Sequence, residues 1–560
     1  MPTRGPARMG PGRSASGRHR ALLSCMEGVA QRGSVRRVSH NSGMPQNFIE
    51  SGREQGFLLP PDVRDWLPAD HLAWFVIDAV RAMDLAAFYA AYRADGHGRA
   101  AYEPSMMVTL VLYANATKQR SSRAIESHCR QDVAYRVITG NLVPDHATIA
   151  RFVVRHESAL AGLFGEVLRV CDQAGLVKPG LVAIDGTRLA GNASREANRE
   201  FEQIAREILA EHKATDEAED RLHGEARGDE LPEQLRTPEG RREFFRQAKH
   251  KRQRQRQETD AQEPQSDAEA AADGGFEFDA ERIVARVQGR EGWLRDAKRQ
   301  LEQRRWQEPD AISRSRSERL VLAAERLETD LDAERAGNEA YEAYRAQGRM
   351  KDGRRFGGPP KPYTPPEVPE GKVNVTDPDS KHIKANDTYV QGYNAQAVVD
   401  ERQIVLAAEI TNSTVDWSQL DPMITATIGE LERAGVSGRP ETALADTQYW
   451  NEQHMDEVIA NKHVQVLIPP DSGTREKPRP GWTGGRYSWM RYVLASELGD
   501  GLYRKRKQMI EPVFGHTKHN RGVTRFHRRG RAAVRTEWRL LMATHNLTKL
   551  HRHTIATQGP

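Results

Sequence analysis

Leu181-Val182-Ala183-Ile184-Asp185-Gly186-Thr187 is the stretch of sequence that decides the fold. Four apolar residues followed by Asp-Gly-Thr predict a buried strand that ends in a turn at Asp185. The pattern returns at residues 442–446, where Thr-Ala-Leu-Ala precedes Asp446. The same periodicity arguments predict further elements: strands over residues 389–399, 403–411 and 464–468, and helices over residues 417–434, 503–520 and 534–550. The chain is therefore expected to be an α/β protein.

Residues 60–175 lack this strand pattern and predict short helices. Helices are expected over residues 105–115, after Pro104, and from Asp145, which is a candidate N-cap. Exposed arginines along such helices are typical of a helix-turn-helix DNA reader, and Arg123 and Arg151 are the candidate DNA contacts. An ordinary helical bundle with solvated arginines explains the same pattern, so both interpretations stand.

A long segment of different composition, residues 195–372, interrupts the α/β pattern. Glu, Arg, Lys, Gln and Ala dominate it. Val287, Leu294 and Leu301 recur every seven residues, which predicts a helical hairpin or a brief coiled coil. We expect residues 252–275 to be disordered, and the segment to end in a Pro-rich linker.

The bulk properties narrow the class of protein only in part. The chain has 560 residues, a formal net charge of +5 and no apolar run of 18 residues, so several domains are expected and a membrane span is not. Cys25, Cys129 and Cys171 lie too far apart to suggest a zinc site or disulfide framework, which fits a reducing cytoplasm. Residues 1–43 are predicted to be a disordered basic extension, or to lie upstream of a true start at Met44. They lack the apolar segment of a secretory signal.

The positive charge is concentrated towards the end of the sequence. Residues 503–531 hold ten Lys or Arg and a single acid, Glu511. The cations alternate with apolar residues, as in a folded segment with a basic face, and we interpret this face as a phosphate-binding surface. Its candidate DNA contacts are Arg504, Arg506, Lys507, Lys518, Arg521 and Arg525.

Three carboxylates suggest the chemistry. Cleavage of a phosphodiester needs an activated nucleophile and a stabilised leaving oxygen, which two divalent ions about 4 Å apart supply. Mg²⁺ prefers oxygen ligands, and strand ends of an open α/β sheet are where such groups converge. Asp185 and Asp446 each follow a predicted strand, and a helix is expected to supply Glu511. Either aspartate alone is as readily a simple turn residue.

The surroundings of Glu511 carry one conflict. Lys507 and Lys518 lie four residues before it and seven after it, so a continuous helix would present all three on one face. Pro512 removes a backbone donor and disfavours helical geometry at the residue before it. The sequence therefore predicts a kink, or a helix that begins at Pro512.

Several short motifs, in this order, resemble those of DDE-type transposases of bacterial insertion sequences. They are Val-Ala-Ile-Asp-Gly-Thr at residues 182–187, Thr-Asp-Pro-Asp-Ser at 376–380, Gly-Tyr-Asn-Ala-Gln at 392–396, Ala-Asp-Thr at 445–447 and Ile-Glu-Pro-Val-Phe-Gly at 510–515. Many relatives carry Tyr and Arg seven and four residues before the Glu. In this chain Arg504 and Lys507 stand at the Tyr and Arg positions, and Tyr503 and Arg506 lie one residue before them. Glu511 and Lys518 match the Glu and Lys of the signature.

The resemblance implies a ribonuclease-H-like mixed sheet with flanking helices. That catalytic domain would comprise residues 176–194 and 373–553, split by the helical insertion at 195–372, preceded by an all-α DNA-binding domain at 44–175 and followed by a tail at 554–560.

The resemblance also implies a site and its partners. Asp185, Asp446 and Glu511 would hold two Mg²⁺ ions, for which Mn²⁺ substitutes. The partners would be double-stranded DNA, as terminal inverted repeats and target, and further copies of the chain. Such a protein would be cytoplasmic and associated with the nucleoid. Gly-rich phosphate loops are absent from the sequence, so no nucleotide cofactor is expected.

Two other functions remain open alongside an active transposase. A DNA-binding protein derived from a transposase but without catalysis would share every basic feature. A scaffold organised by the charged insertion would explain the heptads, but neither the aspartates nor the basic segment. Asp377 and Asp379 are expected to shape a turn beside Pro378, and they are the alternative candidates for metal ligands. The histidines around Glu511 are expected to be surface or packing residues.

Overall fold

The computed structural model describes residues 48–49, 63–93, 100–223, 278–280, 283, 289–307, 315–350, 353–358, 362–385, 388–471 and 482–558. The expectations for residues 1–43 and 252–275, and for Val287 and Cys25, lie outside these residues. No helix in the described part of the chain is both long and apolar enough to cross a bilayer.

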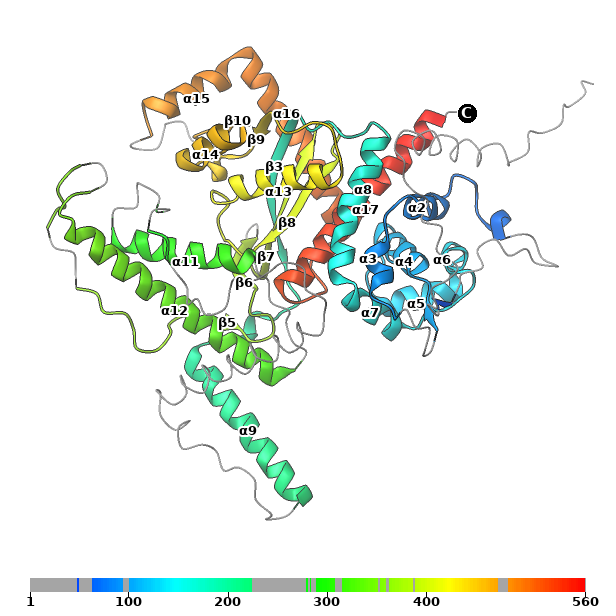
Figure 1. The fold of residues 1–560 in the computed structure, drawn as a ribbon, viewed down its shortest axis with the longest axis horizontal. Helices are drawn as coiled ribbons and strands as arrows, with labels where there is room; N and C mark the ends of the chain where they lie inside the picture. Colours follow the sequence, from blue (N-terminus) through cyan, green and yellow to red (C-terminus); the bar gives the residue numbers. More distant parts are fainter. Residues whose placement is uncertain are drawn as a thin grey trace, which may run out of the picture.

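An all-helical unit forms the first part of the described chain (Figure 1). Its helices are α2 (Leu72–Arg81), α3 (Ala86–Ala90), α4 (Pro104–Ala116), α5 (Ser122–Gln131), α6 (Val133–Thr139), α7 (His146–Arg155) and α8 (Glu157–Gln173). Helix α4 is buried on nearly all sides, because its residues are almost all apolar. The predicted cap of α7 is confirmed, since Asp145 accepts a hydrogen bond from the Thr148 N–H at 2.9 Å. Two short strands, β1 (Phe48–Ile49) and β2 (Ala101–Tyr102), pair in parallel beside it.

A six-stranded mixed sheet forms the centre of the molecule. Its strands are β3 (Leu181–Ala190), β6 (Lys381–Ala385), β7 (Thr388–Asp400), β8 (Val405–Thr411), β9 (Thr442–Leu444) and β10 (Gln465–Leu467). The order is β10-β9-β3-β7, and both β6 and β8 pair with β7. Strands β3, β9 and β10 are mutually parallel, whereas β7 runs antiparallel to β3, β6 and β8. The predicted strands are thus present, and β6 is an additional one.

Strand β3 differs from its prediction in one respect. It does not end at Asp185 but continues to Ala190, because β7 is long enough to pair with it as far as the Ala190–Gly392 pair. Asp185 therefore lies within a strand, while Asp446 lies just beyond the end of one.

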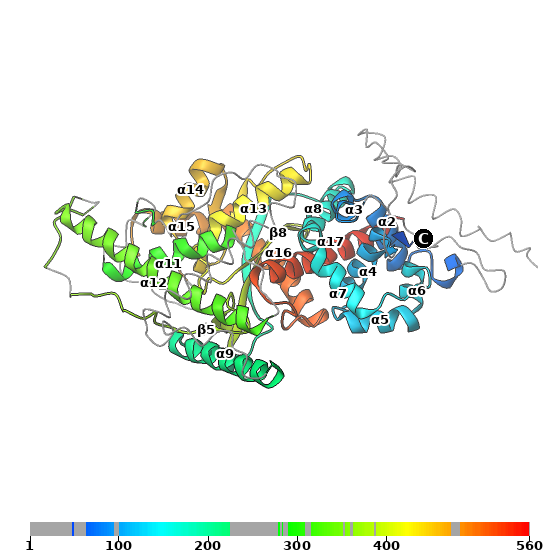
Figure 2. The ribbon, with the colours of Figure 1, turned by 60° about the horizontal axis from the view of Figure 1, so that its bottom comes forward.

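Helices cover both faces of the sheet (Figures 1 and 2). They are α13 (Leu420–Arg433), α14 (Glu452–Lys462), α15 (Gly485–Ala495), α16 (Glu497–Gly515), which runs on into the π-helical η5 (His516–Asn520), and α17 (Arg531–Gln558). Helix α17 packs on α4 and α8 as well as on β8, and so joins the helical unit to the sheet. Within this joint the indole of Trp538 is fully buried and donates to the Gln396 carbonyl at 2.9 Å.

Helix α16 corrects the prediction about Pro512, which lies inside the helix and does not begin it. A proline cannot donate to the carbonyl four residues earlier, here that of Gln508. The side-chain amide of Gln403 donates to this carbonyl instead, at 2.8 Å. A tertiary contact thus replaces the missing helical hydrogen bond, which removes one reason for the helix to end.

The insertion contains the predicted helical hairpin. Helices α11 (Arg290–Gln307) and α12 (Arg316–Ala346) pack along each other, and α9 (Phe201–His223) packs on α12. Leu301 lies buried in their contact, whereas Leu294 is only half-buried. Strands β4 (Asn198–Arg199) and β5 (Val373–Asn374) pair where the insertion leaves and rejoins the sheet.

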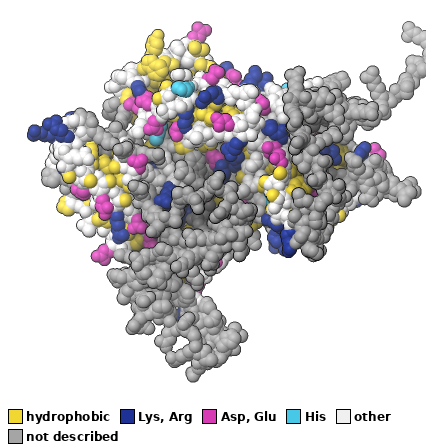
Figure 3. Space-filling model, in the orientation of Figure 1, with side chains coloured by type: hydrophobic (Ala, Val, Ile, Leu, Met, Phe, Trp, Pro, Cys, Tyr) yellow, Lys and Arg dark blue, Asp and Glu magenta, His cyan; other side chains and the backbone are white. Residues whose placement is uncertain are grey.

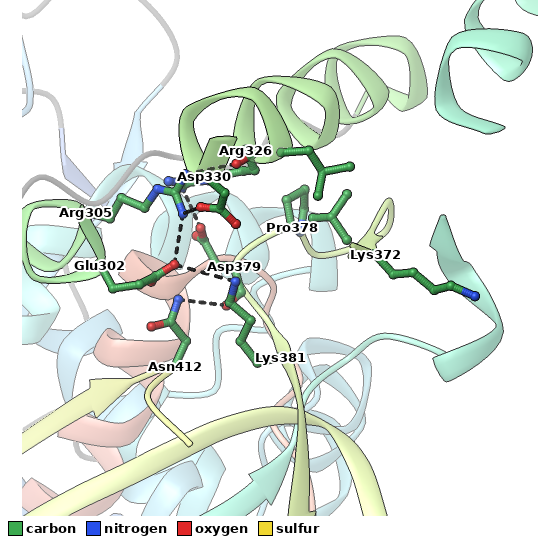
Figure 4. A pocket seen from close by; sticks show the side chains of 11 residues that line it. Glu302, Arg305, Arg326, Asp330, Lys372, Pro378, Asp379, Lys381 and Asn412 are labelled. Carbon is green, nitrogen blue, oxygen red and sulfur yellow. Dashed lines mark hydrogen bonds and ion pairs between the residues drawn. The ribbon is translucent and has the colours of Figure 1, made fainter. Parts of the chain in front are cut away.

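Ion pairs connect this hairpin to the sheet, one of them largely buried and one partly exposed (Figure 4). Arg326 of α12 lies 2.6 Å from Asp379, and Lys381 of β6 lies 3.5 Å from Glu302 of α11. Asp377 and Asp379 are both buried here, with Ser380 N–H donating to the Asp377 carbonyl in a turn at 3.0 Å. The expected turn is therefore present, and its carboxylates serve the junction between insertion and core. The fold class is confirmed as a mixed α/β protein with a helical N-terminal unit and a helical insertion.

Candidate active site

Asp185 in β3 and Asp446, two residues beyond the end of the adjacent parallel strand β9, lie side by side. Ala183 pairs with Leu444, so each aspartate is two residues beyond the same pair. Neighbouring strands are about 4.8 Å apart, which brings two acidic side chains from distant parts of the sequence to one edge of the sheet.

Burial and charge act on both acids. Burial raises the pKa of Asp185 to about 6, where the negative charge of Asp446 adds to the increase and the cation of Arg506 opposes it. Burial also raises the pKa of Asp446, although the Gln448 N–H, which donates to it at 2.9 Å, favours the charged form. Ionising two neighbouring buried carboxyl groups is unfavourable, and a cation bound between them would offset that cost.

A third carboxylate, Asp416, lies on the other side of this edge, in the loop between β8 and α13. Its side chain is 7% exposed, and its Oδ1 accepts hydrogen bonds from the Asn394 and Gln396 amides at 2.7 and 2.9 Å. The charge of Asp416 raises the pKa of Asp446. All three aspartates lie close enough to the buried Tyr449 phenol to raise its pKa further, after the larger effect of burial.

Three cations surround these acids. Arg506 of α16 is almost fully buried, and its Nη1 lies 3.0 Å from Asp185 Oδ2. Arg188 of β3 lies 3.1 Å from Asp416 Oδ2. Burial and the nearby Arg188 lower the pKa of the Lys518 ammonium, and Asp185 has the opposite effect. The site therefore balances three acids against three bases at the edge of the sheet.

Glu511 is not part of this cluster in the structure. It lies on α16, exposed to solvent, while Arg506, Ile510 and Val513 form the buried face of the same helix. Among the described residues, no group of three or more His, Cys, Asp or Glu side chains is arranged to hold a metal ion. The structure thus brings together two of the three predicted carboxylates.

The predicted DNA contacts form an exposed group and a group with buried or half-buried side chains. The second group consists of Arg506, Lys518 and Arg521. Arg504, Lys507, Arg525, Arg123 and Arg151 are exposed, as contacts with phosphate require. On the face drawn in Figure 3, Lys and Arg side chains lie scattered among acidic ones and do not form one large patch.

Arg521, by contrast, is a structural residue in the fold. It is buried, and its guanidinium donates to the carbonyls of Leu541 and Asn115 at 2.6 and 2.7 Å and to the Thr544 hydroxyl at 2.7 Å. These bonds join α4 to α17, so Arg521 is not available to DNA in this structure. The sequence showed its charge but not its burial.

Sequence reasoning also missed Asp416 and Arg188. Asp416 follows no apolar run, and Arg188 comes after the turn predicted at residues 185–187, in what is in fact strand β3. A signal was nevertheless present in Asn394 and Gln396, two amides at alternate positions of a strand that is buried over most of its length. Buried amides require hydrogen-bond partners, and Asp416 is that partner.

The histidines near Glu511 behave as packing or surface residues. His545 is buried and its Nε2 contacts the Gln403 carbonyl at 3.1 Å, with His516 beside it. His519 is exposed. Cys129 and Cys171 are both buried and reduced.

Comparison with known families gives two matches. Residues 61–155 match the family described as Transposase domain (DUF772), and residues 480–551 match the Transposase DDE domain. No curated protein and no solved structure matches the chain. The first match covers α2 to α7 of the helical unit, and the second covers α15, α16 and most of α17, with Glu511 and Lys518. Asp185 and Asp446 lie outside both matched ranges.

Both matches are to domains of transposases, the enzymes that move DNA segments. They support the resemblance seen in the motifs, which is to DDE-type transposases of insertion sequences.

Proposed function

We propose that this transposase cleaves DNA at the terminal inverted repeats of its element and joins the freed ends to a target, using divalent metal ions held by Asp185 and Asp446. The observation that supports the proposal is the pair of aspartates two residues beyond the Ala183–Leu444 pair, in a mixed sheet with the order β10-β9-β3-β7. Acid pairs in this position are suited to metal-assisted phosphodiester chemistry.

The donor set fits a divalent ion. Both groups are carboxylates, which Mg²⁺ prefers, and both have raised pKa values because they are buried near other negative charges. When bound, two Mg²⁺ ions, or Mn²⁺ in their place, would activate the attacking hydroxyl and stabilise the leaving oxygen.

The remaining predicted residues have separate roles in this proposal. Glu511 would complete the carboxylate set when DNA is bound, through a change in α16 or the π-helical turn that follows it. Lys518, beside Asp185, would contact a phosphate at the cut. Arg506 would hold the Asp185 carboxylate in place through its ion pair.

The proposed partners are double-stranded DNA and further copies of the chain. The exposed Arg123 and Arg151 of the helical unit would contact the terminal repeats, and Arg504, Lys507 and Arg525 the DNA near the cut. Two ends must be joined in one reaction, so a dimer or larger assembly on DNA is proposed, associated with the nucleoid.

The test is a nicking assay on supercoiled plasmid carrying the element's ends, with and without Mg²⁺. We expect Asp185→Asn and Asp446→Asn to remove metal-dependent nicking while the gel shift of end DNA persists. Asp172→Asn, half-buried on α8, is the matched control and should nick normally. Nicking by folded Asp185→Asn at the rate of the wild-type protein would refute the proposal.

Glu511→Gln tests the third ligand separately. Loss of nicking with unchanged end binding would support its role, and wild-type nicking would restrict the metal site to the two aspartates. If the wild-type protein binds end DNA but never nicks it with Mg²⁺ or Mn²⁺, the alternative of a DNA-binding protein without catalysis is correct.

A further inference from the structure

We propose that Arg188 binds a backbone phosphate of the DNA at the aspartate pair, and that Asp416 is the carboxylate that positions Arg188 for this role. The inference rests on the proposed function and adds to it a substrate-binding residue and its support.

Arg188 is held by one nitrogen only. Its Nη2 lies 3.1 Å from Asp416 Oδ2, 3.3 Å from Gln448 Oε1 and 3.5 Å from the Thr414 carbonyl. Within the described part of the chain, Nη1 and Nε make no hydrogen bond, and the side chain is 27% exposed. Two guanidinium nitrogens are therefore left for a ligand, and a guanidinium matches the oxygens of a phosphate.

Asp416 is built to hold a cation in place. Its Oδ1 is occupied by the amides of Asn394 and Gln396, so Oδ2 is left for Arg188. The donors come from β3 and β7, whose registers fix them relative to each other. Three donors hold the buried Asp416 carboxylate in one orientation, and its ion pair in turn restricts the position of the Arg188 guanidinium.

The same network reaches the aspartate pair. The Tyr449 hydroxyl donates to Gln396 Oε1, and Tyr449 follows Asp446 by three residues in the short helix η4 (Thr447–Tyr449). Gln448 of this helix contacts Arg188 directly. A phosphate bound at the two aspartates would therefore lie near the Arg188 guanidinium, whose positive charge would attract it.

The alternative is that Arg188 only neutralises the buried charge of Asp416. Such a role needs one contact and no exposure. The network already gives Asp416 two amide donors, and it leaves the outer nitrogens of Arg188 uncovered. A contact with DNA explains both features, whereas neutralisation explains neither.

DNA binding without divalent ions, measured by fluorescence anisotropy on a short labelled duplex over a range of salt concentrations, tests the proposal. Each phosphate contact contributes about 0.9 to the slope of log affinity against log salt. Arg188→Gln should reduce that slope by about one and weaken binding roughly tenfold to a hundredfold. Arg188→Lys keeps the charge but not the planar fork, so it should keep the slope and lose only part of the affinity.

Two further variants complete the design. Asp416→Asn leaves the arginine charged but untethered, so we expect the wild-type slope with weaker binding. Arg433→Gln is the matched control, because Arg433 also pairs with a buried carboxylate, Glu430 at 2.8 Å, on α13. It should bind DNA as the wild-type protein does.

Wild-type affinity and slope in Arg188→Gln would overturn the proposal, even if that variant melts at a lower temperature. This result is independent of the metal-dependent reaction. If Asp185→Asn loses nicking while Arg188→Gln binds normally, the phosphate contact is wrong and the proposed function stands. If Asp185→Asn nicks normally, the proposed function is wrong whatever Arg188 does.

Discussion

Asp377 offers a quantitative test of the junction between the insertion and the core. Its side chain is fully buried, and its Oδ1 accepts hydrogen bonds from the Tyr393 hydroxyl at 2.7 Å and the Gly530 N–H at 3.2 Å. Its Oδ2 is buried without a hydrogen-bond partner among the described residues. Burial, and then the charge of Asp379, raise the pKa of Asp377 from 3.8 to about 7.

The sign of the resulting pH dependence follows from proton binding. Between about pH 4 and pH 7 the folded protein keeps a proton at Asp377 that the unfolded chain has lost. The stability from this group is therefore complete below the unfolded pKa and is lost as the pH rises through the folded pKa. The difference between the two pKa values corresponds to about 4 kcal/mol of unfolding free energy.

Asp377→Asn should remove this dependence. An asparagine keeps the acceptor for Tyr393 and Gly530 but carries no charge. Relative to the wild-type protein, the variant should gain about 2.5 kcal/mol between about pH 5 and pH 8, the part of the full difference that falls in this range. Urea unfolding followed by tryptophan fluorescence at both pH values gives the difference, with Trp538 close to the junction.

Asp379→Asn is the matched control two residues away. It breaks the buried pair with Arg326, so it should destabilise the protein by roughly 3 kcal/mol or more at both pH values. If the stability difference between Asp377→Asn and wild type changes by less than about 1 kcal/mol over this pH range, the carboxyl is ionised in the fold and the reasoning is wrong.

Four further substitutions test the packing of the fold. Gly186→Ala would place a Cβ 2.3 Å from the Gln396 side-chain nitrogen, so it should lower the free energy of unfolding by about 1–3 kcal/mol and weaken DNA nicking. Its control, Gly162→Ala in helix α8, meets nothing within 4 Å and should raise the free energy of unfolding by roughly 0.5–1 kcal/mol, as measured by thermal unfolding. Arg521→Met removes the guanidinium hydrogen bonds to the Leu541 and Asn115 carbonyls, so it should lower the melting temperature and leave the salt slope of DNA binding unchanged. Gln403→Ala removes the donor to the Gln508 carbonyl and should cost about 1 kcal/mol in urea unfolding; no loss would show that Pro512 needs no such compensation.

The sequence predicted the sheet well because its strands are regular. Short apolar runs between polar segments predicted β7, β8, β9 and β10 close to their observed bounds, and heptad spacing predicted the hairpin of the insertion. The end of β3 was misplaced because Asp-Gly-Thr is a strong local turn signal. Pairing with β7 outweighs that signal, and a local pattern contains no information about a partner strand 200 residues away.

The polar residues of the site were harder to predict. Asp185 and Asp446 share a sequence pattern, so their convergence followed from the rule that parallel strands end at the same edge. Asp416 and Arg188 share none, because only the tertiary fold brings the loop after β8 beneath β3. Arg521 shows the reverse error: its charge suggested a surface, but its hydrogen bonds place it inside.

The position of Glu511 follows from the phase of α16. Successive residues of an α-helix are 100° apart, so a carboxylate five residues after Arg506 points about 140° away from it. Met509, Ile510 and Val513 are buried on the side of Arg506, and they fix that phase. A rotation of α16 that turned Glu511 towards Asp185 would expose these apolar side chains and break the Arg506 ion pair. Bringing Glu511 to the aspartates by rotating the whole helix would therefore cost the burial of these side chains. A local change near the π-helical η5 would cost less free energy.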